Sequence, residues 1–168
     1  MRLFPLLVLS VATLAAAPAR DGLREIVHPQ ADLPAFRCLV PADWRSSVDT
    51  MGNLQVSNPA GSVFFSFSFA HAPNPADAHD TLARAVLNGG SNPPWDSREP
   101  VEISGHRGYR YAARVKSGKD LVRAELLIVA VGDRHLATCS VIFTDRLKPA
   151  DETTARLVQA AVKLLATP

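Results

Sequence analysis

Two cysteines are the residues whose chemistry is easiest to anticipate in this sequence. Cys38 and Cys139 are its only thiols. Each alternates with apolar residues in a predicted strand, so both side chains are expected to face the core. In an oxidising compartment such a pair normally closes, provided that its Cα atoms lie within about 7 Å. The pattern predicts a disulfide between Cys38 and Cys139, and two buried free thiols are the alternative.

Histidine and carboxylate side chains are the next candidates, because both are ordinary zinc ligands. His71, His79 and Asp80 lie close together in the sequence. They span a predicted loop and the start of a predicted helix, which favours solvated surface side chains over a shared metal ion. We therefore expect no metal and no cofactor.

Motifs of catalysis and of nucleic-acid binding are absent from the sequence. It contains no H-E-x-x-H, no G-x-S-x-G, no phosphate-binding glycine loop and no C-x-x-C, so no enzymatic activity is expected. Residues 105–108 (GHRG) match a G-x-x-G nucleic-acid loop only superficially and predict a hairpin turn. After them, Tyr109 and Tyr111 should share the core face of a strand, while Arg110 and Arg114 share its solvated face.

Two tryptophans, Trp44 and Trp95, fall in predicted turns. An exposed tryptophan in such a place would be a contact for a partner or a ligand. A buried one would instead close the end of the core. Both residues are therefore candidate contact sites whose exposure decides between the two hypotheses.

The N-terminus has the pattern of a cleavable signal peptide. Arg2 precedes an apolar run over residues 3–17, and Ala17 and Ala19 supply the small residues of an A-x-A cleavage site. The run is shorter than the roughly 20 residues that span a bilayer. We expect residues 1–19 to be removed, leaving a periplasmic or secreted protein without a membrane anchor.

The rest of the chain predicts one α+β domain. Residues 20–35 are expected to be an irregular lead-in, and residues 36–168 a single domain with an antiparallel sheet of about six to seven strands packed against two main helices. One helix should begin at Asn74-Pro75, with Leu82, Ala85 and Val86 on its apolar stripe. The other should span residues 149–165, with an apolar stripe of Leu157, Val158, Ala161, Val162 and Leu165. Strands are predicted at residues 36–40, 54–57, 63–70, 101–104, 108–115, 121–131 and 135–143. The formal net charge of +2 argues against general binding to nucleic acid or to anionic membranes.

Four segments of the sequence resemble the PsbP/Mog1-like domain family. They are residues 36–44 (FRCLVPADW), 58–69 (NPAGSVFFSFSF), 103–111 (ISGHRGYRY) and 135–143 (HLATCSVIF). The resemblance covers nearly all of the expected mature chain and implies an antiparallel sheet between helices. It also implies an accessory or binding protein, without a matching binding motif. Many bacterial relatives are lipoproteins, and this chain lacks their cysteine.

Three functions are compatible with these patterns. The first is a non-catalytic envelope accessory protein that binds a protein partner, which predicts an exposed apolar or aromatic patch. The second is a carrier of a small molecule or lipid, which predicts a cavity between sheet and helix. The third, an unrecognised hydrolase, requires titratable residues that converge in a cleft. We favour the first.

Overall fold

The computed structural model describes residues 22–87 and 94–166, so the predicted signal peptide lies outside the described residues. Strand β5 (Val63–His71) illustrates how its sequence forms its structure. Its inward side chains Val63, Phe65 and Phe67 are at most 1% exposed, whereas the outward Phe64 is 42% exposed. Alternate residues of a strand point to opposite faces, so β5 lies over the core as predicted.

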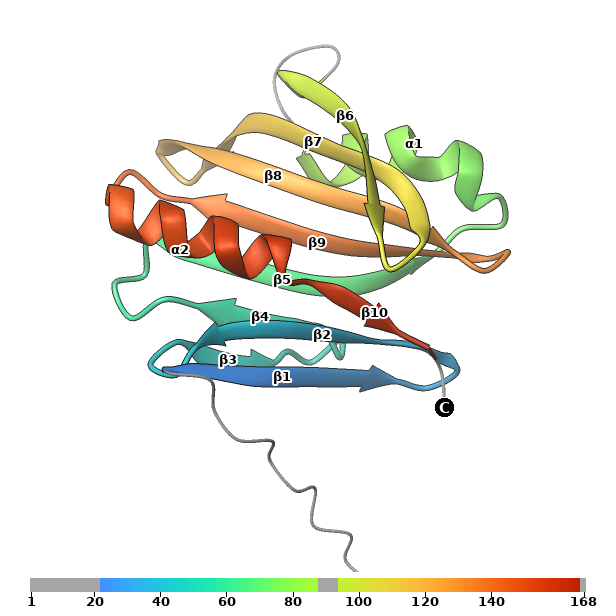
Figure 1. Cartoon of the computed structure of the whole chain (residues 1–168). Coiled ribbons are helices and arrows are strands. Elements are labelled where there is room, and N and C mark those ends of the chain that lie inside the picture. Colours follow the sequence, from blue (N-terminus) through green and yellow to red (C-terminus); the bar gives the residue numbers. More distant parts are fainter. Residues whose placement is uncertain (1–21, 88–93, 167–168) are drawn as a thin grey trace, which may run out of the picture.

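The described elements follow one another as strands, a helix, more strands, a second helix and a last short strand (Figure 1). They are β1 (Leu23–Gln30), β2 (Leu33–Pro41), β3 (Arg45–Val48), β4 (Leu54–Ser57), β5, α1 (Pro75–Leu87), β6 (Ser97–Ile103), β7 (His106–Ser117), β8 (Asp120–Val131), β9 (His135–Phe143), α2 (Pro149–Ala160) and β10 (Lys163–Leu165).

The strands form two antiparallel sheets. The larger has seven strands in the order β3-β4-β5-β9-β8-β7-β6, and the smaller has three in the order β1-β2-β10. Short connections join β6 to β7 and β7 to β8 as hairpins, with Gly105 and Gly118 at positive φ in the two turns. The α+β class, the sheet and the two helices agree with the sequence-based prediction.

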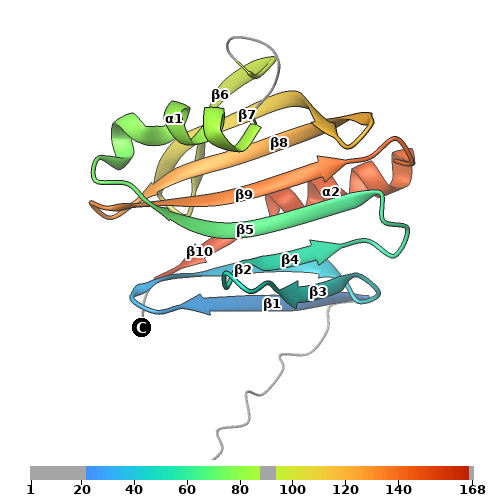
Figure 2. The ribbon, with the colours of Figure 1, turned by 180° about the vertical axis from the view of Figure 1, so that it is seen from behind.

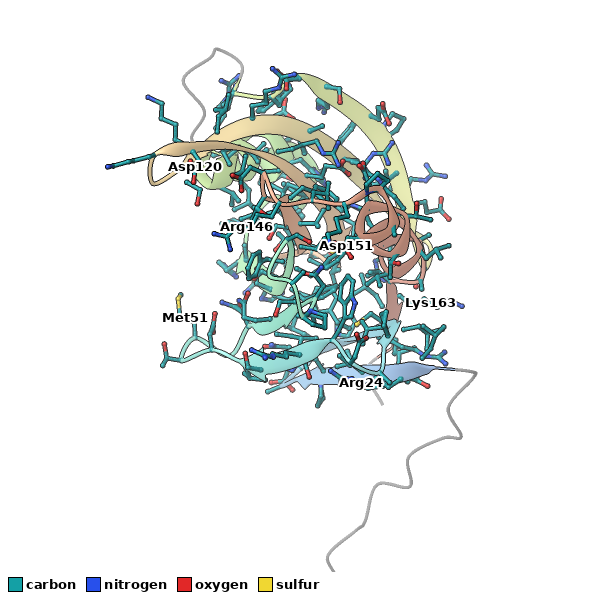
Figure 3. The ribbon with its side chains drawn as sticks, turned by 90° about the vertical axis from the view of Figure 1, so that its left-hand side faces the viewer. Arg24, Met51, Asp120, Arg146, Asp151 and Lys163 are labelled. Carbon is teal, nitrogen blue, oxygen red and sulfur yellow. The ribbon has the colours of Figure 1, made fainter. Side chains whose placement is uncertain are left out.

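The large sheet carries a separate apolar core on each face. On one face, side chains of β5, β8 and β9 pack with the small sheet and α2, including Phe36 and Val158. On the other face, α1 covers β7, β8 and β9 and buries Ala83, Leu87 and Tyr111. Figure 2 shows α1 over this second face, with α2 behind the sheet. The end of the β3–β4 hairpin stands away from both cores, and Met51 there is 85% exposed (Figure 3).

Strand β1 corrects the prediction of an irregular lead-in over residues 20–35. Its hydrogen bonds come from pairing with β2, and Ile26 packs against the first core. Pro29 lies where the register shifts between His28 and Gln30, so its missing N–H interrupts no regular pairing there. Polar composition concealed an edge strand that only its partner defines.

The C-terminal helix is shorter than predicted and is rotated about its axis. It ends at Ala160, after which β10 pairs with β2. Val158 of the predicted stripe is buried as expected, but Leu157 is 68% exposed, and Ala155 and Gln159 are buried instead. Ending the helix allows Leu164 to enter the first core, with its backbone hydrogen bonds supplied by β2.

The cysteines correct a second prediction. Cys38 in β2 and Cys139 in β9 are both buried in the first core, as predicted, but their thiols are free and form no disulfide. Strand β9 pairs with β5 and β8, and β2 belongs to the other sheet, so no strand pairing holds the two cysteines side by side. Burial raises the pKa of Cys38 to about 11, although Arg24 opposes this, and burial raises the pKa of Cys139 further.

Candidate functional site

The two tryptophans differ in burial. Trp44 is 6% exposed and packs with its ring centroid 6.1 Å from that of Phe65. Trp95 is half-buried, and its ring meets the Tyr111 ring at a T-shaped angle with centroids 5.0 Å apart. Trp44 therefore closes the end of the first core, and Trp95 packs on the edge of the second.

The three residues that were weighed as metal ligands have different environments. His71 is exposed, with its ring 5.4 Å from that of His135, whereas His79 is only 5% exposed. Asp80 bonds Arg98 and Tyr111. In the described part of the chain, no three His, Cys, Asp or Glu side chains are placed to hold a metal ion. The expectation of a surface histidine is wrong for His79.

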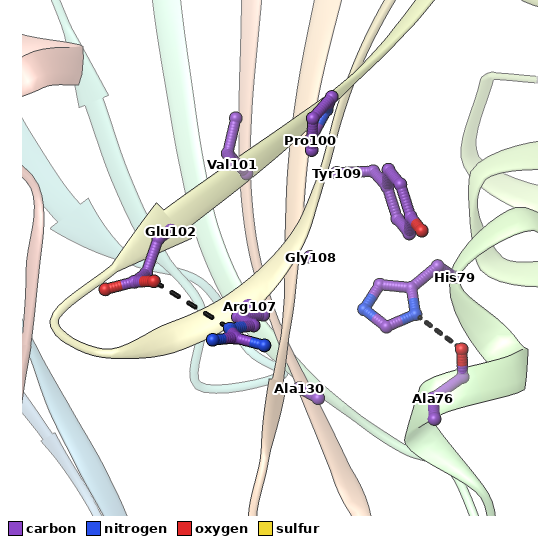
Figure 4. A pocket seen from close by; sticks show the side chains of 9 residues that line it. All are labelled: Ala76, His79, Pro100, Val101, Glu102, Arg107, Gly108, Tyr109 and Ala130. Atoms are coloured by element: carbon purple, nitrogen blue, oxygen red, sulfur yellow. Dashed lines mark hydrogen bonds and ion pairs between the residues drawn. The ribbon is translucent and has the colours of Figure 1, made fainter.

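A groove of about 580 Å³ lies between α1 and the hairpin of β6 and β7 (Figure 4). We call it the α1–β7 groove. Apolar side chains form much of its wall, a histidine and a tyrosine supply the polar atoms near α1, and two charged side chains lie on the side of the hairpin. Its lining residues are Ala76, His79, Pro100, Val101, Glu102, Arg107, Gly108, Tyr109 and Ala130.

His79 is the buried polar side chain of this groove. Its Nδ1–H donates to the carbonyl oxygen of Ala76 at 3.2 Å, in the first turn of α1. That bond fixes the tautomer of the neutral ring, so Nε2 carries the lone pair. Nε2 is buried and has no hydrogen-bond partner among the described residues. Figure 4 shows it pointing across the groove towards β7.

Tyr109 faces His79 from β7 and is fixed on its other side. The two rings meet nearly at right angles with centroids 5.5 Å apart. The guanidinium of Arg98 lies 3.4 Å from the centroid of the Tyr109 ring, and its Nε donates to Asp80 at 2.9 Å. Tyr109 is therefore held between a cation and an imidazole, which restricts its ring to one orientation.

Asp80 completes this support by accepting a hydrogen bond from the Tyr111 hydroxyl at 2.6 Å. Burial alone would raise the pKa of Asp80, but the bonds from Tyr111 and Arg98 outweigh it and lower the pKa. Burial and the Asp80 carboxylate raise the pKa of Tyr111 above its ordinary range. Asp80 therefore stays ionised at neutral pH and ties α1 to β6 and β7.

The hairpin side of the groove is charged but solvated. Arg107 and Glu102 approach to 4.0 Å, with side chains 92% and 60% exposed, which makes a weak ion pair. Between Arg107 and Tyr109, Gly108 brings β7 against β8, since a Cβ there would lie 1.8 Å from the carbonyl oxygen of Ile128. The glycine is thus required for the floor of the groove.

Sequence reasoning missed this groove because it misplaced the buried face of α1. The predicted stripe of Leu82, Ala85 and Val86 is mostly exposed, and Val86 is 50% exposed. The buried residues are instead Pro75, His79, Ala83 and Leu87. Their spacing of four is a helical signal in which the histidine occupies a core position.

A second groove lies at the edge of the large sheet, and Trp44 contributes to its wall. Arg24 there donates to the carbonyl oxygen of Trp44 at 2.6 Å and to Ser46 at 3.1 Å. This groove has a volume of about 730 Å³, and strand β3, whose residues are all exposed, forms part of its wall. Among the described residues, no helix combines the length and apolar character that crossing a bilayer requires.

Comparison with known proteins identifies the fold. No family model and no curated protein matches the sequence. The solution structure of cyanobacterial PsbP (CyanoP) from Synechocystis has a TM-score of 0.61 and 11% identity, covering 91% of this chain and 98% of that one. The crystal structure of LpqN from Mycobacterium tuberculosis has a TM-score of 0.61 and 14% identity, covering 86% and 92%.

A crystal structure from Bacteroides thetaiotaomicron has a TM-score of 0.50 and 16% identity over 78% of this chain, which spans only 45% of that protein. The likeness to CyanoP and LpqN shows a PsbP-like fold. The resemblance to PsbP/Mog1-like domains in the sequence is confirmed as a likeness of fold.

Proposed function

We propose that this protein is an exported, non-catalytic accessory protein of the cell envelope that acts by binding a protein partner through the α1–β7 groove. The observation that carries the proposal is the open groove of about 580 Å³, in whose wall the buried Nε2 of His79 has no hydrogen-bond partner among the residues that the structure describes. Buried polar atoms nearly always have a hydrogen-bond partner. A bound segment of another protein would supply one.

The residues of the groove support binding rather than catalysis. Its described lining contains no serine, threonine or cysteine that His79 would activate as a nucleophile. The Nδ1–H of His79 is bonded to a backbone carbonyl and not to a carboxylate that would stabilise an imidazolium. Glu102 is exposed on the other side of the groove and is paired with Arg107.

Export is proposed from the N-terminal pattern of residues 1–19. The likeness of fold to LpqN, which is described as involved in cell envelope biogenesis, supports an envelope role. The second candidate function is a small-molecule carrier. It is favoured by the position of the groove between helix and sheet and by a volume within the range of about 300–1,000 Å³ that ligand pockets show.

A photo-crosslinking amino acid placed in the full-length precursor tests this proposal in the producing cell. Ala76 is exposed and lines the groove, whereas Val86 is 50% exposed on the same helix and does not line it. We expect the Ala76 probe to capture one specific protein and the Val86 probe to capture none of it. Equal capture at both positions, or no protein captured at Ala76, would contradict binding through this groove.

A further inference from the structure

We infer that the group entering the α1–β7 groove is a neutral aromatic ring with its own hydrogen-bond donor, that is, a tyrosine or tryptophan side chain of the partner. This inference rests on the proposed function and adds the chemistry of the bound group. Three features of the groove lead to it: the acceptor on His79, the aromatic wall at Tyr109, and apolar surroundings that disfavour a charged group.

The acceptor determines that the bound group must donate. With Nδ1–H committed to the Ala76 carbonyl, Nε2 of the neutral ring offers only a lone pair. It is buried and unpartnered among the described residues. An unsatisfied buried acceptor is costly, so a ligand that brings an O–H or N–H regains that loss. A carboxylate has no proton to donate and would meet the lone pair with its own.

The wall of the groove determines that the donor should be carried on a ring. Tyr109 presents its half-buried ring beside His79, with Pro100 in the adjoining part of the wall. Arg98 holds the Tyr109 ring from the other side, 3.4 Å from its centroid. Aromatic pairs in tilted or T-shaped contact add attraction beyond the area they bury. The Tyr109 ring is therefore already oriented before the aromatic ring of a ligand binds beside it.

Charge excludes the cationic donors. A lysine or arginine would bring its charge beside His79, whereas Glu102, the carboxylate of the lining, lies on the hairpin side of the groove (Figure 4). Burying a charge without a close partner costs more than one hydrogen bond returns. Phenol and indole groups are neutral, donate one proton and have flat apolar faces. They match the three features together.

The minimal probes are p-cresol, which has an aromatic ring and a donor, and toluene, which has the same ring without the donor. Titrations of the ¹⁵N-labelled mature protein, followed by NMR of its backbone and histidine ring nitrogens, give both affinities. We expect p-cresol to bind about tenfold more tightly than toluene, as one hydrogen bond would give. The Nε2 signal of His79 should move with p-cresol only.

Variants of His79 separate the contribution of its hydrogen-bond acceptor from the contribution of the shape of the groove. His79→Phe keeps a ring and removes the acceptor, so the preference for p-cresol should disappear while toluene still binds. His79→Gln keeps an acceptor and should retain part of the preference. His71→Phe, a histidine change outside the groove lining, should retain all of it. The backbone spectrum of each variant verifies that it folds.

Equal affinities for the two probes in the natural protein would overturn the inference, as would a preference that survives in His79→Phe or the absence of binding by either probe. These results can be distinguished from a failure of the proposed function. A protein captured at Ala76 together with equal probe affinities would reject only the aromatic donor. Probe selectivity without any captured protein would reject the protein partner and retain the aromatic donor, now on a small molecule.

Discussion

Replacing Arg156 by glutamine should destabilise the protein more than replacing its partner Glu125 by glutamine. Glu125 on β8 is 6% exposed and accepts hydrogen bonds from both Nη atoms of Arg156, at 2.5 and 2.6 Å. Arg156 on α2 is 38% exposed and also lies 3.5 Å from Glu152. Removal of Arg156 leaves a buried carboxylate without its cation. Removal of the Glu125 charge leaves a guanidinium that water and Glu152 still reach.

The two substitutions should therefore lower the free energy of unfolding by different amounts. Breaking a buried pair so that one charge remains buried costs about 3 kcal/mol. Losing a hydrogen bond whose other partner is rehydrated costs about 1 kcal/mol. At about 3 °C for each kcal/mol in a domain of this size, Arg156→Gln should lower Tm by about 10 °C and Glu125→Gln by about 3 °C. Urea titrations at pH 7 measure the same difference in the free energy of unfolding.

The pH dependence of the free energy of unfolding is a stricter test of this role of the Glu125–Arg156 pair. In the natural protein, burial would raise the pKa of Glu125, but Arg156 outweighs it and holds the pKa below the ordinary 4.5. This pair therefore adds stability above pH 4.5, which is lost as pH falls through the lower folded pKa. In Arg156→Gln, that cation no longer opposes the effect of burial, so the pKa of Glu125 should lie above 4.5. Protonation of Glu125 as pH falls should then relieve the cost of burying its charge.

The stability gap between the natural protein and Arg156→Gln should accordingly narrow between pH 7 and pH 4. Urea titrations at pH 7, 5.5 and 4 would measure it, with Glu125→Gln as the matched control for the same pair. A gap that stays constant over this range, or a larger loss at pH 7 in Glu125→Gln than in Arg156→Gln, would refute the reasoning.

Three further outcomes are expected. Gly108→Ala should lose about 3 kcal/mol or more in a urea titration, because its Cβ would lie 1.8 Å from a backbone oxygen of β8; unchanged stability would contradict this close approach. Thiol titration without reductant should find Cys38 and Cys139 unreactive in the native protein and both reactive after denaturation; fewer than two thiols would indicate a bridge. Val158→Ala should cost about 2 kcal/mol and Leu157→Ala less than about 0.5 kcal/mol; similar costs at the two positions would restore the predicted helix face.

The elements that the sequence predicted well are those with a local signal. From Phe65 to Ala70, strand β5 alternates phenylalanines with small residues, and β9 is preceded by a turn. Helix α1 begins at Pro75 after Asn74, as its first-turn proline predicts. In each case a few neighbouring residues determine the local conformation.

The elements that were missed are strands defined by the strand they pair with and not by a pattern of their own. In β10, Leu164 pairs with Phe36 of β2, and the predicted helix is shortened to allow it. Strand β3 has four exposed residues and is defined by its pairing with β4 alone. No local pattern marks such strands, since their hydrogen bonds come from elsewhere in the fold.

The α1–β7 groove depends on the same kind of distant packing. His79 and Tyr109 belong to different elements, and they meet because Ala83 and Leu87 of α1 pack over the second core. A prediction that misplaces the buried face of α1 therefore also misplaces His79. A correctly predicted start of the helix was not enough, because the rotation of the helix about its axis decides which side chains face the sheet.

Within that buried face, His79 is the position where the sequence departs from what stability alone would favour. Ala83 and Leu87 continue the stripe with apolar side chains, whereas His79 brings a polar nitrogen that finds no partner among the described residues. A leucine in its place would bury a larger apolar surface and leave no acceptor unsatisfied. Such departures from an otherwise consistent pattern are expected at functional sites. The proposed binding function accounts for the imidazole at this position, which packing alone does not.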